Sequence, residues 1–458
     1  MNKNKLATYD NPLSKDVLFL GDSLSQYSFV EYDTFKVKGA EIAWINNDYL
    51  RDHEIDIETA EQQILENFAY VSRQYADDVY LDLDDRKVFL ADRYGSAGEV
   101  GNGGSSRCGI NGHFQVKGNG TNPLVAVNVD VGHSTGKLPL SEAVSEAIWS
   151  EICHRELPYG ALRIVAIIRT PQTIIGANTF GDVVEQPCAL MIRELATRPA
   201  HYEPSLYFWP EPEFVRLRDA THKVVELAVN QLEKKEYKLN GSKTPIYDIA
   251  ERFVTRFAAQ IAASRIKGFP HGSLTSSNVA LDGRFLDLGT ISALGDFSNV
   301  ILTAGLGASW DDHLGVAEWL ENFFYYLNKH SDSGLDEKQG RTLVEKFLAV
   351  LETQENIYTA MACGIPEKLT NFEEIGKHIK RELRKGKEHV SRLGDFDELK
   401  FSNELNQALE LVGFPNCIPN FKYRNQKFSR FTIFADSRLQ GMCGSKEQIA
   451  KLVDEYLE

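Results

Sequence analysis

The sequence predicts an α+β fold, and three observations support this. The first half combines short apolar, strand-like runs with a segment in which nine glycines fall between residues 95 and 120. The second half, from about residue 213, carries apolar residues on one face at helical spacing. A loop segment, residues 268–295, interrupts these helices. A strand-rich part therefore precedes a helical part that contains one long loop.

Composition excludes several classes of protein. The chain has 458 residues, of which 43% are hydrophobic and 25% charged, as in ordinary globular proteins. Its 65 acidic and 50 basic residues give a formal net charge of −15. Proteins that bind nucleic acid or anionic membranes need a surplus of cations facing phosphate. We therefore expect neither a nucleic acid nor a membrane as partner.

The cysteines and the N-terminal residues indicate the compartment. Six cysteines are scattered without a C-x-x-C pair, which predicts neither a zinc knuckle nor a disulfide framework. Residues 1–12 are polar, and the apolar run Val17–Leu20 is too short for a signal peptide or a membrane span. These features predict a cytoplasmic protein with reduced thiols.

The individual elements follow from local patterns. Dense glycine indicates backbone with positive φ or close approach to another group. In the first half we expect helices over 57–70 and 140–153, and strands over 17–20, 114–117, 124–131, 162–169 and 189–195. In the second half we expect helices over 247–265, 316–327, 340–352, 372–385 and 446–458. The predicted divisions are an N-terminal extension (1–90), a glycine-rich lobe (91–210) and a mainly helical lobe (211–458).

The long loop carries a metal-binding pattern. His271 lies seven residues before Asn278, and Asp287 with Gly289 follows nine residues after that asparagine. This is the spacing of a kinase catalytic loop and its metal-binding aspartate. An amide oxygen and a carboxylate on adjacent short strands suit Mg²⁺, whose other positions phosphate oxygens can fill. Each residue alone could equally be a turn former or a cap.

A lysine strand accompanies the glycine-rich segment. Phe114–Lys117 predicts a strand that ends in lysine, as in ATP-binding lobes where a helix glutamate holds that lysine. The helix over 140–153 offers Glu142, Glu146 and Glu151. Arg107 and Arg193 are further candidates for binding phosphate, because guanidinium forms bidentate contacts. Glycines, lysine and acidic helix in this order predict a two-lobed ATP-binding transferase.

Several blocks of the sequence resemble the selenoprotein O family of protein adenylyltransferases, which have a pseudokinase fold. The resemblance spans roughly residues 30–445. Its blocks are Ala91–Gly95 with the glycines to Arg107, Gln115–Pro123, Ser145–Glu151, Gly268–Asn278 with Asp287–Gly289, and Ser437–Ser445. It implies a protein-kinase-like two-lobed fold.

The resemblance also implies an activity and roles for residues. ATP would lie inverted relative to a kinase, so that AMP is transferred to a protein or peptide acceptor. The implied ATP-binding residues are Gly101, Gly103, Gly104, Arg107, Lys117, Arg193 and Arg198, the last of which is offset from the family position. Glu146 would orient Lys117, and Asn278 and Asp287 would bind Mg²⁺, or Mn²⁺ in its place.

The chain departs from the family at the base. Ser277 stands where the family has the aspartate that deprotonates a hydroxyl acceptor, and Ser273 stands at the catalytic aspartate of ordinary kinases. Three alternatives stay open. In the first, the protein binds ATP without catalysis and acts through a partner protein. In the second, the acceptor is a carboxylate that needs no base, such as a peptide C-terminus in a microcin-type maturation pathway. In the third, Asp282 or Asp296 replaces the base.

Two other features allow separate hypotheses. Val17–Leu24 resembles the first block of the GDSL hydrolases, with Ser23 as nucleophile and Asp219 and His222 as partners. The nucleotide-binding blocks fill most of the 196 residues between Ser23 and Asp219, which disfavours this hydrolase. Cys443 matches the family's redox cysteine, but residues 288–312 contain no cysteine to pair with it. We therefore expect a plain thiol.

Overall fold

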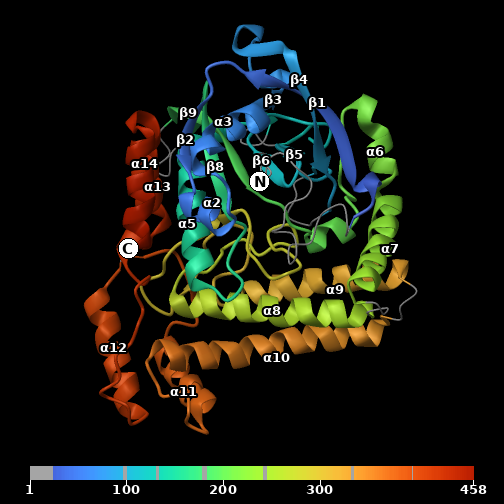
Figure 1. Ribbon diagram of the computed structural model, residues 1–458. Helices are drawn as coiled ribbons and strands as arrows, with labels where there is room; N and C mark the ends of the chain where they lie inside the picture. Colours follow the sequence, from blue (N-terminus) through green and yellow to red (C-terminus); the bar gives the residue numbers. More distant parts are fainter. Residues whose placement is uncertain are drawn as a thin grey trace.

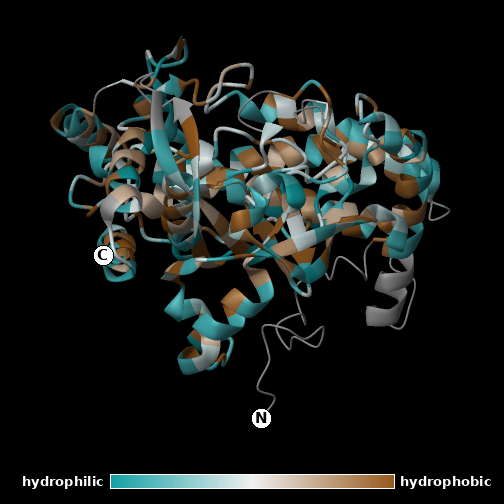
Figure 2. Cartoon of the chain, turned by 90° about the horizontal axis from the view of Figure 1, so that it is seen from above, coloured by the Kyte–Doolittle hydropathy of each residue, from teal (hydrophilic) through white to brown (hydrophobic). Residues whose placement is uncertain are grey.

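The computed structural model describes residues 24–95, 101–129, 134–177, 183–240, 245–331, 335–394 and 396–458. It is a mixed α and β structure in which a twisted sheet lies above a layer of long helices (Figure 1). Helices around the rim show both hydrophilic and hydrophobic residues (Figure 2), as expected for elements that cover a core on one face. No helix within the described residues is long and apolar enough to cross a bilayer.

The sheet is antiparallel throughout its described pairings. Its order is β2-β8-β9-β6-β5-β4-β1-β3, with β7 paired to β9. Strands distant in sequence therefore lie side by side. The bounds are β1 Phe29–Val37, β2 Glu41–Ile45, β3 Tyr70–Ser72, β4 Leu81–Asp92, β5 Cys108–Asn111, β6 Phe114–Lys117, β7 Leu138–Pro139, β8 Ile164–Ala177 and β9 Val183–Glu194.

The helices form the second layer and the flanks (Figure 1). α8 and α10 run side by side below the sheet, whereas α13 and α14 stand along one edge of the molecule. The bounds are α2 Asn47–Asp52, α3 Ile57–Phe68, α5 Leu140–Glu156, α6 Val215–Asp219, α7 Thr221–Asn240, α8 Ile246–Lys267, α9 Asp312–His330, α10 Glu337–Ala362, α11 Phe372–Arg384, α12 Glu398–Leu411, α13 Arg430–Cys443 and α14 Lys446–Leu457. Val390–Ser391 (β11) pairs in parallel with Asn299–Val300 (β10).

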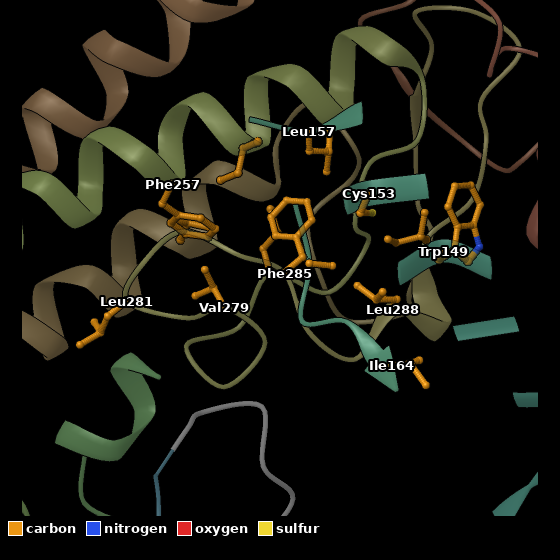
Figure 3. Packing of buried hydrophobic residues seen from close by; sticks show 14 of the residues in the cluster. Trp149, Cys153, Leu157, Ile164, Phe257, Val279, Leu281, Phe285 and Leu288 are labelled. Atoms are coloured by element: carbon orange, nitrogen blue, oxygen red, sulfur yellow. The ribbon is translucent and has the colours of Figure 1, made fainter. Parts of the chain in front are cut away.

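Helix α5 is the centre of the core. Thirteen of its 17 residues are buried, because β8 and β9 cover one side and α13 and α14 another. Figure 3 shows Trp149 and Cys153 of α5 in one hydrophobic cluster with Phe257 of α8 and with Phe285 and Leu288 of the long loop. This packing fixes α5 against the loop.

Most predicted elements are confirmed, and two of the predictions need correction. The helices over 140–153, 247–265, 316–327, 340–352, 372–385 and 446–458 and the strands over 114–117, 162–169 and 189–195 are present, several of them longer than predicted. The helix over 57–70 ends at Phe68, since Tyr70 begins β3. The strand over 124–131 is wrong for its described residues, 124–129. The Asn122 side chain accepts from Leu124 N and makes a turn, and among these described residues only Ala126 forms a bridge, with Pro210. Residues 17–20 lie outside the described part.

The three predicted divisions stay a prediction. The boundary after residue 90 falls inside β4, which pairs with β1 on one side and with β5 on the other. The strands of residues 29–92 and 108–194 therefore belong to one sheet.

Candidate functional site

Lys117 lies at the end of β6, buried between the sheet and helix α5. Its Nζ is 2.5 Å from Glu146 Oε1, 3.0 Å from Asp287 Oδ1 and 3.5 Å from Glu142 Oε1. Glu146 is buried on α5, and Asp287 comes from the long loop. Three elements far apart in the sequence thus meet at one ammonium group.

Two arginines also contact the Asp287 carboxylate. Arg193 of β9 donates from Nη1 to Asp287 Oδ1 at 2.8 Å. Arg198 lies five residues on, with Nη1 3.7 Å from Asp287 Oδ2 and 2.8 Å from the carbonyl oxygen of Ser277. The structure therefore gathers Lys117, Arg193 and Arg198 around Asp287.

Electrostatics keep this cluster ionised. Burial alone would raise the pKa of the Asp287 carboxyl, but Arg193, Lys117 and Arg198 outweigh burial and hold that pKa well below its usual value. Burial would likewise lower the pKa of Lys117, yet Glu146 and Asp287 raise it. Removing a buried charge from water costs several kcal/mol per ion, so a stabilising role for the fold is a poor explanation of such a cluster. Perturbed groups of this kind gather at functional sites.

The backbone at Asp287 is strained. Its φ of 53° and ψ of 63° lie in the left-handed region, which a residue with a Cβ rarely adopts. Such a conformation costs on the order of 1–3 kcal/mol and is typical of functional sites. With this backbone conformation the chain leaves the short antiparallel pairing of Val279 with Phe285, and the Asp287 carboxylate contacts the three cations.

Asn278 lies opposite Leu286, the residue before Asp287, in this short antiparallel pairing. Leu286 N donates to Asn278 O at 3.0 Å, and Val279 forms a bridge with Phe285. The Asn278 amide nitrogen donates to Ser273 O and Oγ, which orients the amide. Hard oxygen ligands of this kind fit Mg²⁺ or Mn²⁺. No group of three or more His, Cys, Asp or Glu side chains suited to a metal occurs in the described ranges.

His271 has a structural role in the loop. Its Nε2 donates to Leu286 O at 2.8 Å, and its Nδ1 accepts from Ser273 N at 3.2 Å. Burial lowers the pKa of His271 to about 4, so the ring is neutral at pH 7. His271 therefore links Ser273, which contacts Asn278, to Leu286, the residue before Asp287.

The described part of the glycine-rich segment is closely packed at Gly103 and Gly104. A Cβ at Gly104, whose φ is 143°, would lie 2.2 Å from Asp92 O, and one at Gly103 would meet the Phe208 ring at 2.7 Å. Gly101 also has a positive φ. Packing and backbone conformation thus account for these three glycines, and their role toward ATP stays a prediction. Arg107 is 3.3 Å from Glu142 Oε1, at the edge of the lysine cluster.

Gln115 was missed by the sequence analysis. It lies directly opposite Arg193 in the β6–β9 pairing, and its Oε1 accepts from Arg193 Nε and Nη2 at 2.9 and 2.7 Å. Its amide nitrogen donates to Asp92 Oδ1, and His201 Nε2 donates to Asp92 Oδ2 at 3.0 Å. One signal was available, since Gln115 and Lys117 are two apart on a strand and share a face.

The remaining candidates lie elsewhere or outside the described part. Glu151 pairs with Arg163 and not with Lys117. Asp282 pairs with Arg284, and Asp296 pairs with Lys387, so neither contacts the cluster. Asp219 ends α6 and His222 lies at the start of α7, while Ser23 lies outside the described residues. Cys443 ends α13, and its side chain is also outside the description.

Comparisons with known proteins give no assignment. No protein-family model matches this chain, and no curated protein matches its sequence.

Proposed function

We propose that the protein is an ATP- and Mg²⁺-dependent adenylyltransferase that transfers AMP to a protein or peptide acceptor, in a kinase-like two-lobed fold of the selenoprotein O type. The convergence of Lys117, Arg193 and Arg198 on Asp287 carries this proposal. A kinase-type site needs a lysine, a glutamate and a metal-binding aspartate. The two arginines add positive charge deep in the site.

The added cations suit AMP transfer in the arrangement that the resemblance to the selenoprotein O family implies. In that arrangement Lys117 and Arg193 would hold the two terminal phosphates, which leaves the α-phosphate toward the acceptor. In the transfer, an acceptor oxygen bonds to the α-phosphorus, the bond from that phosphorus to the bridging oxygen breaks, and pyrophosphate leaves with the electron pair. Lys117 and the arginines stabilise the charge on the leaving group.

Asn278 and Asp287 would hold the Mg²⁺ ion. Asp287 supplies a permanently ionised oxygen because of its lowered pKa, and Asn278 supplies an oriented amide. When bound, the metal neutralises phosphate charge. Glu146 keeps Lys117 at 2.5 Å and so fixes the ammonium group that would contact phosphate.

A carboxylate acceptor is the second candidate, and one observation favours it. The described loop carries no carboxylate at position 273 or 277, and Asp282 and Asp296 are bound to Arg284 and Lys387. General-base assistance contributes about 10²–10⁴-fold, which a hydroxyl acceptor would lose here. A carboxylate is already ionised at pH 7 and needs only positioning. The product would be an acyl-adenylate.

Parallel labelling with α-³²P-ATP and γ-³²P-ATP tests the proposal. We expect total cellular protein to gain label from the α position only, and to gain none with Asp287→Ala. Asp282→Asn is the matched control, and it should label normally. Hydroxylamine should release the label from an acyl-adenylate as AMP and leave an unlabelled hydroxamate on the acceptor. Label from the γ position alone would indicate a kinase. ATP binding without any transfer would instead support a pseudoenzyme that acts through a partner protein.

A further inference from the structure

Glu203 is a buried carboxyl that the proposed chemistry does not use. It follows the short 3₁₀ turn Pro199–Tyr202, and its side chain is 8% exposed. Glu203 Oε1 has no hydrogen-bond partner, and no described cation forms an ion pair with this carboxyl. The side chain faces a small cavity. Its lining is Arg93, Tyr94, His201, Glu203, Ser205, Thr221, Val224 and Val225.

The backbone around Glu203 joins the two halves of the candidate site. Glu203 O accepts from Gly95 N at 3.0 Å, at the start of the glycine-rich segment. Ala200 N, in the same turn, donates to Ser276 O at 3.1 Å. The Ser276 hydroxyl also faces the Glu203 carboxyl, without a well-formed hydrogen bond. Glu203 is therefore connected to Ser276 through the backbone of this turn and through its own side chain.

Ser276 in turn adjoins the groups of the candidate site. The carbonyl of Ser277 accepts from Arg198 Nη1 at 2.8 Å, and Asn278 follows directly. Resting on the proposed function, we propose that Glu203 is a positioning residue that keeps the segment Ser276–Asn278 in its binding geometry only while its carboxyl is protonated.

The physical reason is the cost of a buried, unpaired charge. Burial raises the pKa of Glu203 to about 8, and the Ser276 hydroxyl opposes this only in part. Above that pH the carboxylate must gain water or a donor, because an unpaired buried charge is strongly unfavourable. We expect the ionised carboxylate to displace Ser276, which faces it, or the side chains that line the cavity.

The other titratable groups around Glu203 do not compensate its charge. Arg93 donates to the carbonyl oxygens of Tyr27 and Leu217, and burial lowers the pKa of His201, which keeps its ring neutral. Tyr94 lines the cavity. From α9, Tyr326 faces Glu203, which adds to the rise in the pKa of Tyr326, and His222 of α7 packs on that ring.

The test compares the affinity for Mg·ATP of wild type and Glu203→Gln between pH 6.5 and 9.5. Glutamine keeps the shape and cannot ionise. We expect wild-type affinity to fall about tenfold as the pH passes 8, the size of a typical coupling between sites, while Glu203→Gln stays level. Glu211→Gln, on an exposed residue nearby, should follow wild type. The same pH profile in wild type and Glu203→Gln would overturn the proposal.

A second measurement separates this proposal from the proposed function. The folded state holds the Glu203 proton more tightly than the unfolded state, so its contribution to stability is lost as pH rises from about 4.5 to about 8. The Tm of Glu203→Gln minus that of wild type should therefore grow over this range. Hydrogen exchange of wild-type residues 273–278 should quicken above pH 8 relative to α8, once corrected for intrinsic rates. Failure to bind Mg·ATP at any pH contradicts the proposed function alone, whereas level Tm differences and unchanged exchange contradict the Glu203 proposal.

Discussion

Arg193 Nη1 donates a 2.8 Å hydrogen bond to Asp287 Oδ1 across 94 residues of sequence. The bond joins β9 of the sheet to the loop that interrupts the helices. The same guanidinium donates two further hydrogen bonds to Gln115 Oε1, so the Arg193 side chain has little conformational freedom. Asp287 is strained and ionised where Arg193 meets it. In the proposed function, this contact brings the metal-binding loop against the sheet.

Replacing Arg193 should weaken nucleotide binding. Arg193→Gln removes a fixed cation that would contact phosphate, and hydrogen bonds to charged groups contribute about 1.5–3 kcal/mol. We expect the Kd for Mg·ATP, measured by calorimetry, to rise roughly thirtyfold. Arg86→Gln, on an exposed pair with Asp33 on the same sheet, is the control. An unchanged Kd in Arg193→Gln would remove Arg193 from the binding site.

Lys117 and Glu146 should act as a unit. Lys117→Met and Glu146→Gln each break the 2.5 Å contact, so the double variant should lose little more Mg·ATP affinity than Lys117→Met alone. We expect a coupling energy of about 1–3 kcal/mol in the double-mutant cycle. Glu142→Gln, at 3.5 Å from Lys117, should couple less. Fully additive effects would show that Glu146 does not orient Lys117.

Stability should depend on pH through His271. Its pKa is about 4 in the folded protein and about 6.5 when unfolded, so the unfolded chain binds more protons between these values. This contribution is complete above pH 6.5 and is lost as the pH falls toward 4, by about 3 kcal/mol. Urea unfolding of wild type and His271→Gln should therefore converge at low pH. His378→Gln, on an exposed helix position, should track wild type throughout. Parallel curves for His271→Gln would contradict a buried neutral ring.

The C-terminal helices should control the position of Glu146. α13 and α14 pack against α5, and the buried Tyr456 donates to Asp436 Oδ2 at 2.7 Å. Tyr456→Ala should lower the free energy of unfolding by about 3 kcal/mol and weaken Mg·ATP binding several-fold, although no site residue is changed. Lys451→Ala, exposed on the same helix, should alter neither. Reduced stability with full affinity would show that α5 is held without α14.

The sequence predicted local structure well and long-range contacts poorly. One-faced apolar patterns located α8 and α10, because burial of one helix face leaves a 3.6-residue period. The strand predicted over 124–131 does not form in the described residues 124–129, since the Asn122 side chain organises a turn there and Val127 is exposed. Apolar runs of this length do not distinguish a strand from other buried segments.

The candidate site divides in the same way. Lys117, Asn278 and Asp287 could be named as candidates because each stands at a characteristic local spacing. The contact of Gln115 with Arg193 could not be foreseen, since it requires β6 to lie beside β9, a pairing that skips two intervening strands. The importance of Glu203 is visible only from its burial and its missing partner.

The products formed from ATP distinguish AMP transfer from every alternative. Purified protein, Mg·ATP and total cellular protein are incubated, and the nucleotide and phosphate products are separated and quantified for wild type and Asp287→Ala. We expect pyrophosphate in amounts equal to the AMP bound to acceptor, and neither product with Asp287→Ala. Formation of ADP with phosphorylated acceptor, or no product despite tight Mg·ATP binding, would contradict it.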